Sequence, residues 1–553
     1  MESRLEPFKV SGTLVDVDRD ELRGVEITIS SDGTIAEIAD CENPDPGYLM
    51  PGFVDAHVHI ESSMLMPAVF AHTAIRHGTL GAVTDPHEIA NVAGMEGVRD
   101  MMDWCGGCDF VFGIGAPSCV PSVVFESCAE PIGPEEIAEL MKDDRITHLS
   151  EVMNVPGVLG GDVAIAAKIR SAQEAGKPVD GHAPGVSGRD LEKYLAAGIT
   201  TDHECVEYPE ALAKVKAGMT VMIRGGSAAK LNPALLGLLN RFSAKCMFCS
   251  DDKHPDDLIK GHINLLAAEA YRHGAPLTAV VRAACVNPVR HFKLPLGLLA
   301  VGDFADFIRV LDLSTFSPVD VFRRGRREPL SAAGPVAEIG ADVSGKHMHA
   351  REVCERDLAV AVDEDLREIR IIGAEDGLLV TKTLHDSPLL SEGEVVADAE
   401  RDILKIAVVN RYRPEPPAVG FIRGFGLKRG AIASSVSHDS HNIICVGSTD
   451  RAIVSAINRV IFDKGGLAVA DSGGNVAASL PLPVAGLMSD KSAEYVACRY
   501  QDCDRLAKMM GSRLSAPFMT LSFMALPVIP ELKMTDKGLF DVCTFRPAGV
   551  RFK

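Results

Sequence analysis

Residues 50–63, which read MPGFVDAHVHIESS, decide the fold of this chain. A Pro-Gly turn precedes a short run of β-branched and aromatic residues, which predicts a buried strand ending at His57 and His59. Side chains alternate between the two faces of a strand, so these two imidazoles project to the same side and can bind one metal ion together. Taken alone, the pair is also compatible with two buried histidines hydrogen-bonded in an ordinary loop.

Length and composition narrow the class of protein. The chain has 553 residues, a formal net charge of −20 and 46% hydrophobic residues, which predicts about two to four globular domains. The acidic balance argues against nucleic-acid binding, which draws on clusters of Lys and Arg. No run of about 18 apolar residues occurs, so no membrane-spanning helix and no membrane partner are predicted. The 14 scattered cysteines, with no basic-then-apolar leader, predict reduced thiols and a cytoplasmic location.

Short apolar strands alternate with helical stretches from residue 51 to about residue 300. Counting the opening strand, there are about eight, and the other candidates lie at residues 82–85, 110–114, 148–151, 178–182, 200–203, 220–224 and 245–251. About eight β/α units in roughly 250 residues predict a (β/α)8 TIM-like barrel, whose functional groups gather at the C-terminal ends of the strands.

The residues that close these strands are mostly metal ligands or titratable groups. They are His57, His59, Asp85, Glu151, His182, His203, Arg224 and Asp251. A single histidine at a strand end is commonly structural. Four histidines and several carboxylates at successive strand ends instead favour a metal centre at this end of the barrel.

The regions that flank the predicted barrel, 51–300, have different patterns. Residues 1–50 predict a β meander, and residues 301–335 return to short strands, so we expect the two to form one composite β domain. A polar stretch near 331–350 is predicted to be a linker, and residues 351–553 an additional α+β domain.

The C-terminal region holds one further cluster of polar residues. Residues 452–462 have helical periodicity, whereas the sequence SHDSHN at 437–442 favours a loop. His438, Asp439 and His441 in this loop are candidates for a lid or an extra site, and an ordinary polar loop is the alternative.

Several motifs resemble those of the bacterial and archaeal adenine deaminases of the amidohydrolase superfamily. They are PGFVDAHVHIESS at 51–63, DPHEIAN at 85–91, EVMN at 151–154, DGHAP at 180–184, DHE at 202–204, SDDKHPDD at 250–257, SHDSHN at 437–442 and FMALPVIPELK at 523–533. The resemblance therefore covers almost the whole chain. The His-x-His pair marks only the superfamily, whereas the Glu-Ser-Ser after it, the DPHE segment and the C-terminal motifs are narrower.

The resemblance implies a centre with two divalent metal ions. The ligands it implies are His57, His59 and Asp251 for the first ion, His182 and His203 for the second, and Glu151 as the bridge between them. Glu151 stands where many relatives carry a carboxylated lysine. The resemblance implies Mn²⁺ or Fe²⁺, and mixed imidazole and carboxylate ligands leave Zn²⁺ open as well.

The implied reaction is the hydrolytic deamination of adenine to hypoxanthine and ammonia, a step of purine salvage. Divalent ions lower the pKa of a shared water toward about 7 and so supply hydroxide at neutral pH. Asp251 is expected to accept the hydroxide proton and to pass it to the leaving ammonia. Glu204 and Glu88 are both candidates for the donor that protonates N1 of the ring. The candidates for binding the purine or orienting ligands are Asp85, His87, Asn154, Arg224 and Asp252.

Alternatives from other classes stay open. Another cyclic amidohydrolase could open a ring amide with the same metal hydroxide, a related purine could be the substrate, or the chain could be an idle metal-binding protein. The H-x-E and P-C-x-x-C signature of deaminases that act on polynucleotides is absent, so a free small-molecule purine is expected. Members of the family commonly self-associate, and we expect a homo-oligomer.

Overall fold

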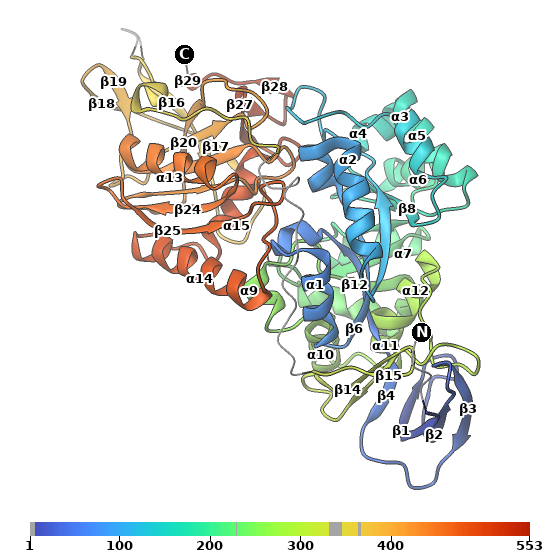
Figure 1. Cartoon of the computed structure of the whole chain (residues 1–553). Coiled ribbons are helices and arrows are strands. Elements are labelled where there is room, and N and C mark those ends of the chain that lie inside the picture. The colour runs from blue at the N-terminus through green and yellow to red at the C-terminus, as the bar shows by residue number, and fades with distance from the viewer. Residues whose placement is uncertain (1–5, 228, 331–345, 363–365, 553) are drawn as a thin grey trace.

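The computed structural model describes residues 6–227, 229–330, 346–362 and 366–552. It confirms the predicted fold class, a parallel β/α barrel with a flanking composite β domain and a C-terminal α+β domain (Figure 1). The barrel strands are β5 (Phe53–Val58), β6 (Thr79–Thr84), β7 (Val111–Ala116), β8 (Ile146–Val152), β9 (Val179–Gly181), β10 (Thr201–Asp202), β11 (Thr220–Arg224) and β12 (Cys246–Cys249). They form a five-stranded sheet, β5 to β9, and a three-stranded sheet, β10 to β12, each in chain order.

Backbone contacts at two seams join these sheets into a ring. At the seam between β12 and β5, Val58 and Asp251 form a parallel bridge, and the Asp251 N–H donates to the His57 carbonyl at 2.9 Å. At the seam between β9 and β10, the Thr200 N–H donates to the Val179 carbonyl at 3.3 Å. The first seam places Asp251 beside the two histidines although the segments lie far apart in the sequence.

Helices between the strands cover the outside of the barrel, with their apolar faces inward. The longer ones are α1 (Pro67–Ile75), α2 (His87–Gly106), α3 (Pro134–Leu140), α5 (Val163–Glu174), α6 (Gly188–Ala196), α7 (Tyr208–Lys216) and α10 (Ile263–Arg272). The shorter ones are α4 (Val155–Gly160), α8 (Leu239–Phe242), α9 (Pro255–Leu258), α11 (Leu277–Val281) and α12 (Asn287–Phe292). Among the residues described, no helix is both long and apolar enough to cross a membrane.

Segments from before and after the barrel share one seven-stranded sheet. Its order is β15 (Arg326–Arg327), β14 (Pro318–Arg323), β13 (Phe307–Val310), β4 (Tyr48–Pro51), β1 (Phe8–Asp16), β2 (Glu21–Ile29) and β3 (Ile35–Asp40). Gly52 joins β4 directly to barrel strand β5, and a Cβ at Gly52 would lie 2.4 Å from side-chain atoms of Leu80. The composite sheet is therefore continuous with the strand that carries His57. Residues 331–345, which include the end of this predicted domain and most of the predicted linker, lie outside the described part of the chain.

The C-terminal domain is built on a second large sheet. Its strands, in order, are β17 (Lys382–Asp386), β16 (Glu368–Gly373), β21 (Ala418–Arg423), β20 (Leu404–Val409), β23 (Ile443–Gly447), β22 (Ala431–Ser434), β24 (Gly466–Ala470) and β25 (Val476–Pro481). Helix α13 (Asp450–Phe462) covers one face, as its periodicity predicts. The opposite face belongs to a core that is continuous with the barrel and includes α14 (Ala493–Met509) and α15 (Pro517–Ser522).

Strand β2 offers a matched test of the composite sheet. Ile27 is fully buried in that strand, whereas Leu22 is 50% exposed. We expect Ile27→Ala to destabilise the protein by about 2–5 kcal/mol, because it leaves a cavity in a packed core. Leu22→Ala should cost less than about 0.5 kcal/mol. Thermal denaturation of the two variants checks this, and equal shifts in melting temperature would contradict the assigned core face of β2.

Candidate metal centre and active site

The C-terminal ends of the barrel strands line one side of a small cavity. Twelve of the sixteen residues predicted from the sequence line this cavity, and four do not: His57, Asp85, Asn154 and His441. The C-terminal domain supplies the opposite wall with Leu379, His438, Asp439, Phe523, Leu526 and Ile529. The site is therefore enclosed by two domains.

Glu151, at the end of β8, lies in the middle of the imidazole groups. Its Oε1 lies 3.3 Å from His59 Nε2 and 3.8 Å from His57 Nε2. Its Oε2 lies 2.7 Å from His182 Nδ1 and 3.2 Å from His203 Nε2. One oxygen thus faces the histidines of β5 and the other faces those that follow β9 and β10, which is the arrangement a bridging carboxylate requires.

The hydrogen bond of His57 leaves one ring nitrogen free. His57 Nδ1 lies 3.0 Å from Asp180 Oδ2, and both side chains are fully buried. Burial would raise the pKa of Asp180, but the hydrogen bond from His57 holds it at about 2, so the carboxylate is charged and Nδ1 donates. His57 Nε2 is buried and has no hydrogen-bond partner among the described residues. A free imidazole lone pair oriented by a carboxylate is typical of a metal ligand.

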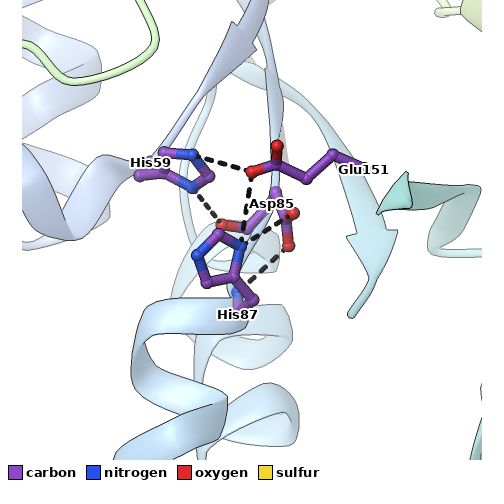
Figure 2. A group of neighbouring side chains, drawn as sticks. All are labelled: His59, Asp85, His87 and Glu151. Carbon is purple, nitrogen blue, oxygen red and sulfur yellow. Dashed lines mark hydrogen bonds and ion pairs between the residues drawn. The ribbon is translucent and has the colours of Figure 1, made fainter. Parts of the chain in front are cut away.

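His59 is oriented in the same way by a backbone carbonyl (Figure 2). Its Nδ1 lies 3.0 Å from the Asp85 carbonyl oxygen, so Nδ1 donates and Nε2 faces Glu151 and Asp251. The Asp85 carboxylate is engaged elsewhere, since it accepts from the N–H of His87 and lies 3.0 Å from His87 Nδ1. In the structure the Asp85 side chain and carbonyl both hold histidines, and its predicted contact with substrate stays a prediction.

A charged triad stands at the ends of β10, β11 and β12. Arg224 Nη1 contacts both Glu204 Oε1 and Asp251 Oδ2, and Arg224 Nη2 donates to Glu204 Oε2 at 3.0 Å. The other oxygen of Asp251 lies 3.2 Å from His59 Nε2. Arg224 was expected to bind substrate; in the structure its guanidinium fixes two carboxylates at the edge of the cavity.

Two further predicted residues have protein partners in the structure. The Asn154 side chain accepts the Gly157 N–H at 2.8 Å and caps α4, and the neighbouring Met153 lines the cavity instead. Glu88 lines the cavity but is held by His438 and His441. Burial raises the pKa of Glu88, but these two imidazoles outweigh it and hold the pKa well below the usual range. Both oxygens of Glu88 are thus engaged by imidazoles, and its role as the donor to N1 stays a prediction.

The sequence analysis missed Asp180 and the apolar wall. Asp180 was detectable, because it lies two residues before His182 at a strand end and so shares its face. The wall residues carry no such signal. Leu379 and Phe523 are drawn together by Lys533, whose Nζ donates to their carbonyls at 2.8 and 3.0 Å.

The barrel and the ligand groups at its strand ends define a metal-dependent hydrolase, and residues 48–327 match the Amidohydrolase family. Residues 378–546 match the Adenine deaminase C-terminal domain. The chain is 46% identical over 540 residues to the adenine deaminase of Salinibacter ruber, covering 97% of this chain and 98% of the relative. It is 45% identical over 548 residues to that of Methanosarcina acetivorans, with the same coverage. The chain therefore belongs to the adenine deaminase family.

Replacing Glu151 tests the centre. We expect Glu151→Gln to retain less than half of the bound metal, because an amide cannot supply two anionic oxygens to two cations. Metal content per chain after reconstitution and desalting measures this. Glu174→Gln, on the surface helix α5, is the control and should bind metal as the wild type does. Full metal content in Glu151→Gln would contradict the assignment of Glu151 as the bridge.

The buried Lys533 gives a pH-dependent prediction. Burial lowers its pKa to about 7, against about 10.4 in an unfolded chain. Between these values the unfolded state binds more protons, so Lys533 makes the free energy of unfolding rise with pH, by at most about 1.4 kcal/mol per unit. We expect Lys533→Met to reduce this slope in urea denaturation at pH 7, 8 and 9, whereas the exposed Lys491→Met should leave it as it is. Identical slopes in both variants would show that Lys533 is charged in the folded protein.

Proposed function

We propose that this chain catalyses the hydrolytic deamination of adenine to hypoxanthine and ammonia. The arrangement around Glu151 carries the proposal, because it aligns four histidines and Asp251 for two cations beside a cavity with an apolar wall. That wall belongs to the Adenine deaminase C-terminal domain, which favours a purine substrate over the opening of a ring amide.

The ligand groups fit two divalent ions. His57, His59 and Asp251 would hold the first, His182 and His203 would hold the second, and Glu151 would lie between them. Imidazole with carboxylate suits Mn²⁺ or Fe²⁺, which we favour from the family resemblance, and also Zn²⁺. When bound, two such ions supply hydroxide at neutral pH by lowering the pKa of water.

The protons are moved by carboxylates. Asp251 stands between His59 and Arg224, where it can take a proton from the attacking water and return it to the departing amine. We favour Glu204 for the contact with N1, because Arg224 holds it on the same side of the cavity as Asp251, the group proposed to handle the water proton. Arg224 keeps Glu204 and Asp251 on the same side of the ring.

The proposed setting is purine salvage in the cytoplasm. A free base is the small-molecule partner, and the net charge of −20 disfavours nucleic acid as a substrate. The 14 cysteines scattered through the sequence support this setting, because a reducing compartment keeps such thiols unpaired. Self-association as a homo-oligomer is proposed from the family resemblance alone.

Activity with defined metals tests the proposal. We expect metal-reconstituted protein to release ammonia from adenine and to form hypoxanthine. Asp251→Asn should lower kcat by about 10²–10⁴-fold, the usual contribution of a general acid–base group. The control is Asp256→Asn, which alters a carboxylate on α9 that does not line the cavity and should keep the wild-type rate.

Two outcomes would contradict the proposal. Turnover of hydantoins or dihydropyrimidines without turnover of adenine would reassign the substrate class. Wild-type kcat in Asp251→Asn at unchanged metal content would remove Asp251 from the proton path.

A further inference from the structure

Glu88 connects the barrel to a loop of the C-terminal domain. It lies in the first turn of α2, directly after β6, and is 1% exposed. One carboxylate oxygen contacts His438 Nδ1 and the other contacts His441 Nε2, both in the loop between β22 and β23. These contacts fix the loop against the mouth of the barrel.

The hydrogen bonds of His441 decide its tautomer. The Ser437 N–H donates to His441 Nδ1 at 3.1 Å, so Nδ1 accepts and the proton resides on Nε2, where it is donated to Glu88. A cation at Nε2 would require a proton on Nδ1, directly against the Ser437 N–H. The three side chains therefore form a hydrogen-bonded anchor; they also lie close enough together to hold a metal ion, so the extra site at this loop stays a prediction.

The two histidines differ in what their remaining atoms face. His441 does not line the cavity, and its backbone carbonyl accepts from the fully buried Arg411 at 3.2 Å. His438 does line the cavity. Because its Nδ1 is taken by Glu88, the atom left for a ligand is Nε2, which lies 3.7 Å from Asp252 Oδ1.

Phe523 supports the His438 ring from the C-terminal domain. The two rings are stacked at 4.6 Å between centroids with an angle of 26°. Leu526 and Ile529, which follow Phe523 in the chain, line the same wall. A flat apolar wall beside one polar ring atom is suited to an aromatic heterocycle with a hydrogen-bond acceptor at its edge.

His438 and Glu204 lie on different sides of the barrel mouth. Glu204 follows β10 and pairs with Arg224 of β11, whereas His438 contacts Glu88 after β6 and approaches Asp252 after β12. In adenine, N1 and N7 flank C6 on opposite sides. A ring with N1 toward Glu204 therefore turns N7 toward the side that His438 occupies.

We infer that His438 is a substrate-binding residue, whose Nε2–H donates a hydrogen bond to N7 of adenine while Glu88 positions its ring. This inference rests on the proposed adenine deamination and adds to it a specific role for the C-terminal domain. The barrel then supplies the reacting groups, and the C-terminal domain binds the imidazole ring of the purine.

The charge around His438 agrees with a donor at Nε2. Burial would lower the pKa of His438, but Glu88 and Asp252 outweigh burial and raise it to about 9. Asp439 also faces this group, and its contribution has the same sign. A carboxylate faces each ring nitrogen, Glu88 at Nδ1 and Asp252 at Nε2, and this geometry favours a ring that is protonated on both.

Substrate analogues test the contact without relying on a loss of activity alone. 7-Deazaadenine replaces N7 by C–H, and 3-deazaadenine serves as the control analogue. We expect wild-type kcat/KM for 7-deazaadenine to be about 5–150-fold lower than for adenine, the usual cost of one unpaired buried hydrogen-bonding group.

Two replacements of His438 separate its two ring nitrogens. In His438→Asn the amide can keep the Nδ1 contact with Glu88, but nothing reaches the Nε2 position. Adenine turnover should therefore fall, and the ratio of kcat/KM for adenine to that for 7-deazaadenine should fall by at least about fivefold from its wild-type value. In His438→Gln the amide reaches the Nε2 position and should restore part of the ratio. His441→Gln keeps the contact with Glu88 and should keep the wild-type ratio. The change of this ratio from wild type to variant cancels the intrinsic reactivity of each analogue.

Each outcome bears on a distinct claim. A wild-type ratio retained in His438→Asn, or a ratio that collapses for 3-deazaadenine instead, would overturn the contact with N7. The melting temperature of His438→Asn shows whether the variant folds. If it does not fold, kcat/KM of the wild type for 7-deazaadenine and 3-deazaadenine tests the contact with N7. Absence of adenine turnover in the wild type would refute the proposed function itself.

Discussion

The Glu151 carboxylate, surrounded by imidazoles, is the constraint on which the rest of the structure depends. Its two oxygens lie within 4 Å of His57, His59, His182 and His203, which come from three different strand ends. Such groups approach one another in a dry interior only if each is hydrogen-bonded or shares a cation. Asp180, behind His57, shows how the barrel provides this support from its own strands.

Local patterns were enough to predict the barrel and most of its strand ends. Period-two alternation identifies buried strands, and parallel strands bring their C-terminal ends to one edge, so residues such as His203 and Asp251 could be grouped before any contact was known. The helix cap formed by Asn154 was also predictable, since an Asn followed by Val-Pro is typical of a helix N-cap. The motif EVMN at 151–154 instead led to the prediction of a functional role for Asn154.

Contacts between domains could not be read from the sequence. Nothing local to Phe523 or Leu379 indicates that they face a barrel cavity, and their apolar side chains look like ordinary core. Glu88 was recognised as unusual, but its partners lie 350 and 353 residues away. The SHDSHN segment was correctly predicted as a loop. Its contact with the barrel depends on the packing of the barrel against the C-terminal domain, whose buried residues form one continuous core.

The junction at Gly52 limits how the barrel segment can be recombined during evolution. Strand β4 lies between β1 and β13 in the composite sheet and passes through this single residue into the strand that carries His57. The barrel segment therefore cannot be replaced by the barrel of another protein without also disturbing the composite sheet. A new barrel would have to arrive with matching segments on both sides, so the continuous strand disfavours recombination at these borders.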